Sequence, residues 1–425
     1  MISLRIRSPL YSLLFFFALM PYISPWVQFP GNLQPYCFVL GWILALMYVN
    51  KKRWMLDFDG YFLGVVFFSI VTIFYLNPFG PVDIGQIFRK SISIFMSLGL
   101  LFIVSMTGFL KAKNAVVISV GLYTFFGLLH YLDADLFIEL ASKFVLLRDV
   151  EIGVRGTPSL APEATDFGFT MVYMIVIVCI MRADRLLSAP LFSAIFLACI
   201  VNVVLSQSVS GVIAGCLLSG IWCVRRIQLS TKRLIFGFFL VVFFLASSEA
   251  FLFSGKTMFG DVRVVQIGSE FLRDPSILLS TSFAHRFVHL YVGALGFFQT
   301  VGLGFGAGTF TIIAPEIYIN SNVAAYFGLN AHYTHACYES LKESPVSVIG
   351  LLIFEYGFVG FALVLYLISL PFLCKNKYRY YISALIFLTL FQSFPLAYPL
   401  MWLLLGYVFW SRETSAGLVT YAVRP

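Results

Sequence analysis

The chain has 425 residues, of which 60% are hydrophobic, 18% are aromatic and only 11% are charged, and its formal net charge is +8. A soluble domain carries about 25% charged residues and is about half apolar, so this composition excludes an aqueous enzyme, a nucleic-acid-binding protein and a disordered chain. The seven cysteines lie mostly inside apolar stretches, and their spacing predicts neither a disulfide framework nor a metal site. The composition is that of an integral membrane protein.

Apolar stretches recur along the whole chain. A helix needs about 20 apolar residues to cross a hydrocarbon core of about 30 Å. The sequence predicts about 12 such helices, or 11 with a re-entrant segment where Pro395 and Pro399 interrupt the last stretches. The first stretch follows basic residues as a signal peptide does, but no small-residue cleavage site follows it, so we expect a retained helix. The approximate bounds are 8–29, 35–50, 60–77, 91–110, 114–131, 166–181, 187–206, 208–224, 234–251, 346–373, 379–395 and 397–411.

The basic residues are distributed unevenly over the connections between these helices. With the N-terminus in the cytoplasm, the inside connections hold 18 of the 28 Lys and Arg residues and only four of the 20 Asp and Glu residues. The positive-inside rule therefore predicts that both termini are cytoplasmic. The inside connections are too short for a nucleotide-hydrolysing domain, and the chain contains no GxxxxGK[ST] loop.

Two longer connections lie on the predicted outer face, at 132–165 and, between predicted helices 9 and 10, at 252–345. The second is long enough to contain helices of its own. All five histidines lie on or beside this outer face, which is where we expect any chemistry. The sequence shows no internal repeat and no flexible linker, so it predicts a single membrane domain over residues 1–425. The histidines are at positions 130, 285, 289, 332 and 335.

The first outer connection ends in a motif that leads into a helix. Arg155 and Gly156 are followed by Glu163 and Asp166 at the predicted helix start. One interpretation is a solvated loop with an acid favoured by the helix dipole. The other is an anion-binding arginine with an orienting carboxylate.

The second connection contains a polar stripe at helical spacing. Ser282, His285, Arg286 and His289 fall on one face of a predicted helix, which is typical of a helix lying along a membrane surface. It leads into a glycine-rich turn, Gly302–Gly308, in which the backbone can approach a ligand closely. The alternative is an interfacial amphipathic helix without a site.

Further candidates follow at 332–339. His332, His335 and Cys337 could ligate zinc, but no fourth ligand is evident, so we expect no metal. Histidines near carboxylates such as Glu339 suit general-base catalysis, because the ordinary pKa of histidine lies near neutrality. The alternative is that these are ordinary loop histidines.

One carboxylate lies inside a predicted span. Glu355 is expected to face the protein interior or a polar cavity, because a charge at the centre of a membrane helix costs about 2.5 kcal/mol or more. Gly357 and Gly360 beside it allow close helix packing. Both a structural role, bracing a polar neighbour, and a direct functional role remain open for this glutamate.

Together these motifs resemble the O-antigen polymerase and ligase superfamily of bacterial surface polysaccharide assembly. The similarity consists of many spans, a large periplasmic loop in the second half, and three short motifs between about 155 and 360. Ligases of this superfamily carry a His-Asn pair shortly before the glutamate, whereas this chain has Val346 and Ser347, which favours a polymerase. The motifs are Arg155-Gly156 with Glu163, Arg286 ahead of Gly302, Gly304 and Gly306, and Glu355 with Gly357 and Gly360.

The resemblance implies a GT-C-like inner-membrane glycosyltransferase that needs no metal or cofactor. Such an enzyme polymerises undecaprenyl-pyrophosphate-linked repeat units at the periplasmic face with inversion, and a chain-length regulator is a candidate partner. Arginines suit a leaving pyrophosphate, because charge-assisted hydrogen bonds contribute about 1.5–3 kcal/mol each. Arg155 and Arg286 are therefore expected to bind the pyrophosphate. The candidate bases, in decreasing order, are His332, His335 and Glu339; the supporting residues are Glu163, His285, His289 and Glu355.

Three other functions are compatible with parts of the sequence. A ligase that attaches finished chains to the lipid A core shares nearly every feature. A transporter or flippase of lipid-linked oligosaccharides predicts two related halves and mid-membrane charges, whereas here Glu355 stands nearly alone. A membrane O-acyltransferase would place its essential histidine in a helix that lines a tunnel.

Overall fold

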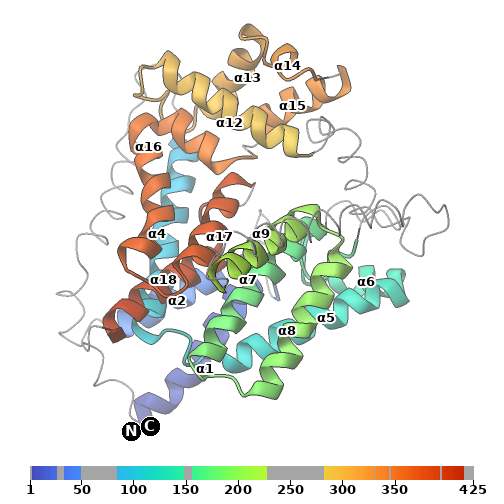
Figure 1. The fold of residues 1–425 in the computed structure, drawn as a ribbon, viewed down its shortest axis with the longest axis vertical. Helices are drawn as coiled ribbons and strands as arrows, with labels where there is room; N and C mark the ends of the chain where they lie inside the picture. Colours follow the sequence, from blue (N-terminus) through green and yellow to red (C-terminus); the bar gives the residue numbers. More distant parts are fainter. Residues whose placement is uncertain are drawn as a thin grey trace. The chain divides into compact units, whose positions relative to one another are not determined.

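The computed structural model describes residues 2–25, 33–48, 84–147, 156–226, 282–329, 331–343, 346–392 and 395–415. Over these ranges all regular secondary structure is helical (Figure 1). The chain divides into two compact units, which are described separately. The first comprises Met1–Pro21, Pro35–Ala115 and Leu278–Pro425, and the second comprises Tyr22–Gln34 and Val116–Ile277. The single membrane domain stays a prediction.

The second unit is built around one central helix. Its helices are most of α5 (Lys113–Leu132), then α6 (Ala134–Ala141), α7 (Ala164–Ala183), α8 (Ala189–Ser206) and α9 (Val209–Arg226). Helix α7 packs against both α8 and α9. Of the 18 residues in its most apolar stretch, 78% are buried inside the protein, compared with 22% in α8. Tyr123 of α5 stacks on Phe167 of α7 with ring centroids 5.5 Å apart, so α7 supplies the core of this unit.

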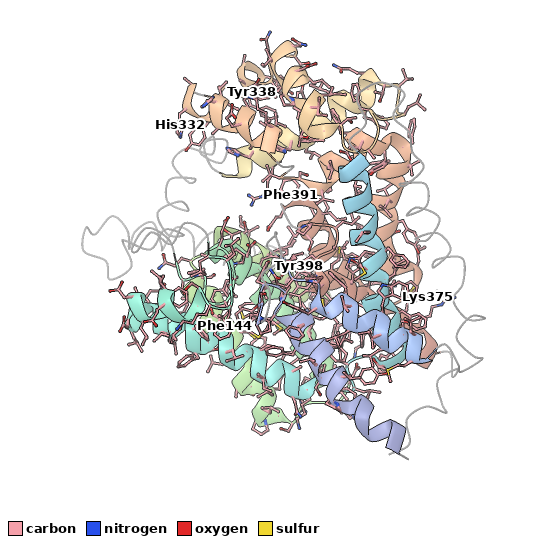
Figure 2. The ribbon with its side chains drawn as sticks, turned by 180° about the vertical axis from the view of Figure 1, so that it is seen from behind. Phe144, His332, Tyr338, Lys375, Phe391 and Tyr398 are labelled. Atoms are coloured by element: carbon pink, nitrogen blue, oxygen red, sulfur yellow. The ribbon has the colours of Figure 1, made fainter. Side chains whose placement is uncertain are left out.

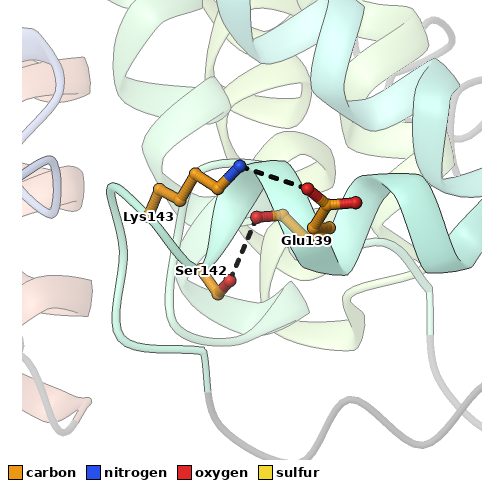
Figure 3. A network of polar contacts seen from close by, with 3 residues as sticks. All are labelled: Glu139, Ser142 and Lys143. Carbon is orange, nitrogen blue, oxygen red and sulfur yellow. Dashed lines mark hydrogen bonds and ion pairs between the residues drawn. The ribbon is translucent and has the colours of Figure 1, made fainter.

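Helix α6 lies in the predicted first outer connection and ends in polar contacts. Asp133 caps its N-terminus by accepting a hydrogen bond from the N–H of Leu136 at 3.0 Å. At the other end, Nζ of Lys143 lies 3.2 Å from Oε1 of Glu139, and Oγ of Ser142 donates to the Glu139 carbonyl (Figure 3). These exposed charges suit a position in water rather than in lipid.

The first unit contains a group of apolar helices joined by aromatic contacts. Its members are α1 (Ile2–Leu19), α2 (Tyr36–Tyr48), α4 (Ile84–Thr107), α17 (Arg379–Phe391) and α18 (Pro399–Ser415). Helix α4 packs against both α2 and α18. Just after α4, the ring of Phe109 stacks on Tyr407 of α18 at 5.1 Å and meets Phe15 of α1 edge-on at 6.3 Å. Aromatic pairs therefore help to join three segments that are distant in the sequence.

The same unit carries a second helix group at one end of α16 (Figure 1). It consists of α12 (Ser282–Gln299), α13 (Phe310–Asn320), α14 (Val323–Tyr326) and α15 (Ala331–Glu343), followed by α16 (Val348–Leu373). Buried residues of these helices, including Val292, Ile317 and Leu341, form one hydrophobic cluster with Phe354 of α16. The expectation that the long second connection contains helices is confirmed for residues 282–343.

The helical membrane-protein character predicted from the sequence agrees with the structure. Each predicted span that falls on described residues contains a helix, and 60–77 and 234–251 lie outside those residues. Four described helices, α5, α7, α8 and α16, are long and apolar enough to cross a membrane by length and composition. The count of about 12 spans and the side on which each connection lies stay predictions.

Candidate functional site

Helix α12 carries the predicted polar stripe and buries part of it. The segment is helical from Ser282, as its spacing predicts. Arg286 is buried, with 5% of its surface exposed, and His289 is completely buried, whereas His285 is only partly buried. The stripe is therefore not a uniformly solvated face, because two of its charged or titratable side chains point into the protein.

His289 joins three segments through both nitrogens of its ring. The backbone N–H of Val346, just before α16, donates to Nδ1 at 3.0 Å. Nε2 lies 3.0 Å from Oγ of Ser340 in α15, and this hydroxyl donates to the carbonyl of Cys337 at 2.8 Å. Because Nδ1 accepts a hydrogen bond, the proton of the neutral ring is on Nε2, which donates to Ser340.

The distance between His289 and Ser340 is that of a catalytic serine–histidine dyad, but the hydrogen bond runs in the opposite direction, from the histidine to the serine. A general base would need a free lone pair on Nε2 to take the proton of the Ser340 hydroxyl. Here Nε2 is the donor, and Nδ1 is occupied by the N–H of Val346. In this geometry His289 ties α12 to α15 and to the start of α16, and it is not poised to activate Ser340.

Burial determines the ionisation of His289. Loss of hydration and, secondarily, the nearby His285 lower the pKa of His289 to about 3. Burial and the adjacent Arg286 also lower the pKa of His285. Both effects favour the neutral ring, which is the form that the two hydrogen bonds of His289 require.

The glycine-rich turn after α12 interlocks with the glutamate-glycine motif of α16. The N–H groups of Phe305 and Gly306 donate to the carbonyl oxygens of Phe354 and Glu355, both at 2.9 Å. In return, the N–H of Phe358 donates to the carbonyl of Gly302 at 2.8 Å. The sequence predicted a turn that can approach a ligand; in the structure the group that it approaches closely is the backbone of α16.

The glycines of both motifs are required by this close contact. Gly302, Gly304, Gly306 and Gly308 all have φ between 80° and 99°, a region that residues with a side chain rarely adopt. A Cβ on Gly304 would lie 2.6 Å from the carbonyl oxygen of Glu355, and one on Gly357 would overlap the carbonyl of Gly302. The spacing of these glycines therefore encodes a backbone-to-backbone lock between residues 302–306 and 354–358.

Glu355 is completely buried beside this lock. Its Oε1 accepts a hydrogen bond of 3.4 Å from the N–H of Phe310, the first residue of α13. Thr309, the N-cap residue of α13, makes no side-chain cap bond there, and a carboxylate at a helix N-terminus is favoured by the dipole. The ring of Phe310 also lies 5.6 Å from that of His289, so Phe310 contacts both buried residues, Glu355 and His289.

The three candidate bases lie on α15 and, unlike His289 and Glu355, are accessible to solvent. His332 and His335 are exposed and Glu339 is partly exposed, and their spacing places all three on one face of the helix. Oε1 of Glu339 lies 2.9 Å from Nζ of Lys342. His332 lies at the outer edge of its helix group (Figure 2). Cys337 is completely buried on another face, so it does not join the two histidines.

No cluster of three potential metal ligands occurs in the ranges that the structure describes. Val346 and Ser347, compared above with the His-Asn pair of ligases, both make hydrogen bonds that support the structure. Val346 donates to His289, and the Ser347 hydroxyl caps α16 by accepting from the N–H of Gly350 at 3.3 Å. Sequence reasoning missed Ser340 and this cap, although a serine directly before an apolar run is a recognisable helix start.

The first predicted motif belongs to the other unit, and Arg155 itself lies outside the described residues. Residues 156–162 are buried, which contradicts the solvated-loop interpretation for this part. Gly156 presses against the end of α8, where a Cβ would overlap the carbonyl of Ser206, and the hydroxyl of Ser159 donates to the Tyr123 carbonyl at 2.7 Å. Glu163 is the N-cap residue of α7 without a side-chain cap bond.

Comparison with known proteins adds no relative to this description. No protein-family model matches the chain, and neither a curated protein nor a solved structure matches it.

Proposed function

We propose that the chain is a membrane glycosyltransferase that polymerises undecaprenyl-pyrophosphate-linked repeat units into a surface polysaccharide. The reaction is an inverting, metal-independent transfer at the periplasmic face of the bacterial inner membrane. The proposal includes about 12 spans in a GT-C-like arrangement, with both termini in the cytoplasm, as the distribution of basic residues favours.

One observation carries the proposal. Two motifs that support the resemblance, Gly302–Gly306 and Glu355–Gly360, form one interlocked backbone structure although they are about 50 residues apart in the sequence. Arg286, the third element of the resemblance in this region, is buried on the helix that leads directly into the lock. This packing supports the proposal that the motifs belong to one site.

The proposal assigns different roles to the buried and the exposed residues. Arg286 binds the leaving pyrophosphate, because guanidinium–phosphate hydrogen bonds strengthen as charge develops. Arg155, the other arginine expected to bind it, lies outside the described residues. His289 and Glu355 hold α12, α13 and α16 in position. His289 accepts from the N–H of Val346 and bonds to Ser340, and Glu355 accepts from the N–H of Phe310. His332, followed by His335 and Glu339, is the candidate base for the acceptor hydroxyl, because these side chains are accessible on α15.

The test is deletion of the gene followed by complementation with variants, with the surface polysaccharide separated on a gel. Deletion is expected to collapse long chains to a single repeat unit on the lipid core. Complementation with Arg286→Ala should leave that pattern although the protein reaches the membrane, whereas Lys377→Ala, an exposed cation beyond α16, should restore long chains.

Other outcomes contradict the proposal in specific ways. Loss of every repeat unit from the surface would indicate a flippase or a ligase. Chains of normal length that lack a substituent would indicate an acyltransferase. Full activity of Arg286→Ala would be compatible with a polymerase but would show that Arg286 does not bind the pyrophosphate.

A further inference from the structure

Helix α16 is not one straight membrane helix. Gly357 has φ 54° and ψ −128°, which breaks the helix into residues 348–356 and 358–373. A Cβ on Gly360 would overlap the carbonyl oxygen of Leu352. Residues eight apart in a straight helix are separated by about 12 Å, so the chain bends sharply at Gly357 and brings the start of the second segment back against the first.

The two segments have different surroundings. No residue from 348 to 357 is exposed, because α12 and its neighbours cover this segment. In contrast, residues 358–373 carry a stripe of exposed apolar side chains at helical spacing, namely Phe358, Phe361, Leu365 and Phe372. A continuous apolar stripe that the protein leaves exposed is typical of a helix face in contact with lipid.

The length of the second segment indicates how far it extends across the membrane. Residues 358–373 rise about 24 Å at about 1.5 Å per residue, which is close to the hydrocarbon thickness of about 30 Å. The exposed Lys375 and Lys377 follow its end and mark one polar boundary. Lys375 lies far from the α12–α15 group (Figure 2). Phe358 therefore lies within a few ångströms of the opposite boundary.

A second set of exposed apolar side chains surrounds Phe358. The turn after α12 is hydrogen-bonded to this residue, and the rings of Phe297 and Phe358 lie 4.8 Å apart. The exposed side chains of Val301 and Leu303 project from the same turn, and that of Phe298 projects from the last turn of α12; Val301 is 84% exposed. Val301 also has φ 53°, an unusual conformation for a β-branched residue. The turn therefore holds an exposed valine in a strained backbone conformation beside Phe358.

The backbone of the turn is suited to a medium without water. The N–H groups of residues 300–306 all donate within the protein, to carbonyl oxygens or, from Gly304, to Oγ1 of Thr300. No charged residue occurs between His289 and Glu316. An unsatisfied backbone group costs several kcal/mol in hydrocarbon. The N–H groups of this turn avoid that cost, which suits a turn at the edge of the hydrocarbon core.

We propose that Phe298, Val301, Leu303 and Phe358, together called the apolar knee, insert into the outer leaflet and contact lipid acyl chains. Only residues 358–373 of α16 then cross the membrane. Residues 348–356 lie with α12 at the level of the headgroups, and the lock at Gly302–Gly306 fixes the α12–α15 group at that height. The partner of this surface is the bilayer itself, and the inference is independent of the proposed enzymatic activity.

The test uses nitroxide labels on the full-length protein in vesicles of phosphatidylcholine and phosphatidylglycerol. Leu303→Cys and Phe298→Cys are labelled in a Cys216→Ser background, because Cys216 is the exposed cysteine among those described. The labelled parent protein supplies the residual signal. Ile319→Cys, an apolar position near the end of α13 that is about as exposed as Leu303, is the matched control. Collision rates are measured with oxygen, which concentrates in lipid, and with a water-soluble nickel chelate.

We expect labels at 298 and 303 to collide more often with oxygen than with the nickel chelate, and the label at 319 to show the reverse. Frequent collision of the 303 label with the nickel chelate would place the knee in water and overturn the proposal. Low collision rates with both reagents would mean that protein covers the knee, which also overturns it. Phe298 lies within a regular helix, so its variant remains informative if Leu303→Cys disturbs the turn.

Discussion

The buried polar residues of α12 and α16 and the exposed polar face of α15 differ in what holds them in place. His289 and Glu355 are completely buried, and both accept hydrogen bonds from backbone N–H groups of other segments. His332, His335 and Glu339 lie on an accessible helix face. Removing a buried partner leaves a desolvated polar group, which costs about 1–3 kcal/mol, whereas exposed side chains can be removed with little effect on folding. The contribution of His289 and Glu355 to stability can therefore be measured separately from the proposed catalytic role of the exposed face of α15.

The strongest test of the buried side is the backbone lock. Gly357→Ala is expected to destabilise the protein by about 4 kcal/mol, because the substitution combines an unfavourable positive φ with an overlap against the Gly302 carbonyl. The midpoint of thermal unfolding in detergent measures the change. Gly121→Ala, on a helix with open space around the glycine, should be neutral or stabilising, and equal loss in both variants would show that the lock is not special.

The next largest effect is expected at His289. His289→Ala removes the acceptor for Val346 and the contact with Ser340 and leaves a cavity, so we expect a loss of about 3 kcal/mol in the free energy of unfolding. Hydrogen exchange should also become faster at the amide of Val346. An unchanged exchange rate at that amide would contradict the tie between α12 and α16.

Glu355 offers a chemical comparison of two substitutions. Glu355→Ala leaves the N–H of Phe310 without this acceptor and should cost about 2 kcal/mol. Glu355→Gln keeps a carbonyl oxygen in nearly the same volume, so its loss of stability should be smaller. Chemical denaturation of the two variants side by side measures the difference, and a larger loss for the glutamine variant would mean that the negative charge is the important property.

The pH dependence of stability follows from the same burial. The pKa of His289 is lowered to about 3 in the folded protein, whereas an unfolded histidine titrates near 6.5. Between these values the unfolded chain binds the extra proton, so stability is present above about pH 6.5 and falls by up to about 1.4 kcal/mol for each pH unit below it. His285, whose pKa is also lowered, acts in the same direction.

A variant isolates the contribution of His289. In His289→Asn the side chain at this position no longer titrates, so the dependence of the unfolding midpoint on pH between about 6.5 and 4 should become shallower. An unchanged slope would assign the effect to other groups.

The sequence allowed the helices to be predicted well, because long apolar runs and helical spacing are local signals. The helix from Ser282 and the buried position of Glu355 were both expected. The burial of His289 was not, since spacing places it on the same polar stripe as His285 and Ser282. Likewise, the glycine turn predicted a close approach but not its partner, because the pairing of 302–306 with 354–358 depends on contacts between distant segments.

The exposed face of α15 should give the smallest effect on stability and the clearest effect on function. His332→Ala and Glu339→Ala are expected to change the free energy of unfolding by less than about 0.5 kcal/mol, as is usual for surface substitutions. If His332 is the base of the proposed transfer, its variant should lose about 100-fold or more in polymerisation rate at normal membrane levels. Lys342→Ala breaks the ion pair with Glu339 without removing a candidate base, so it controls for disturbance of the helix surface. Full activity of the alanine variants of His332, His335 and Glu339 would exclude this face from catalysis.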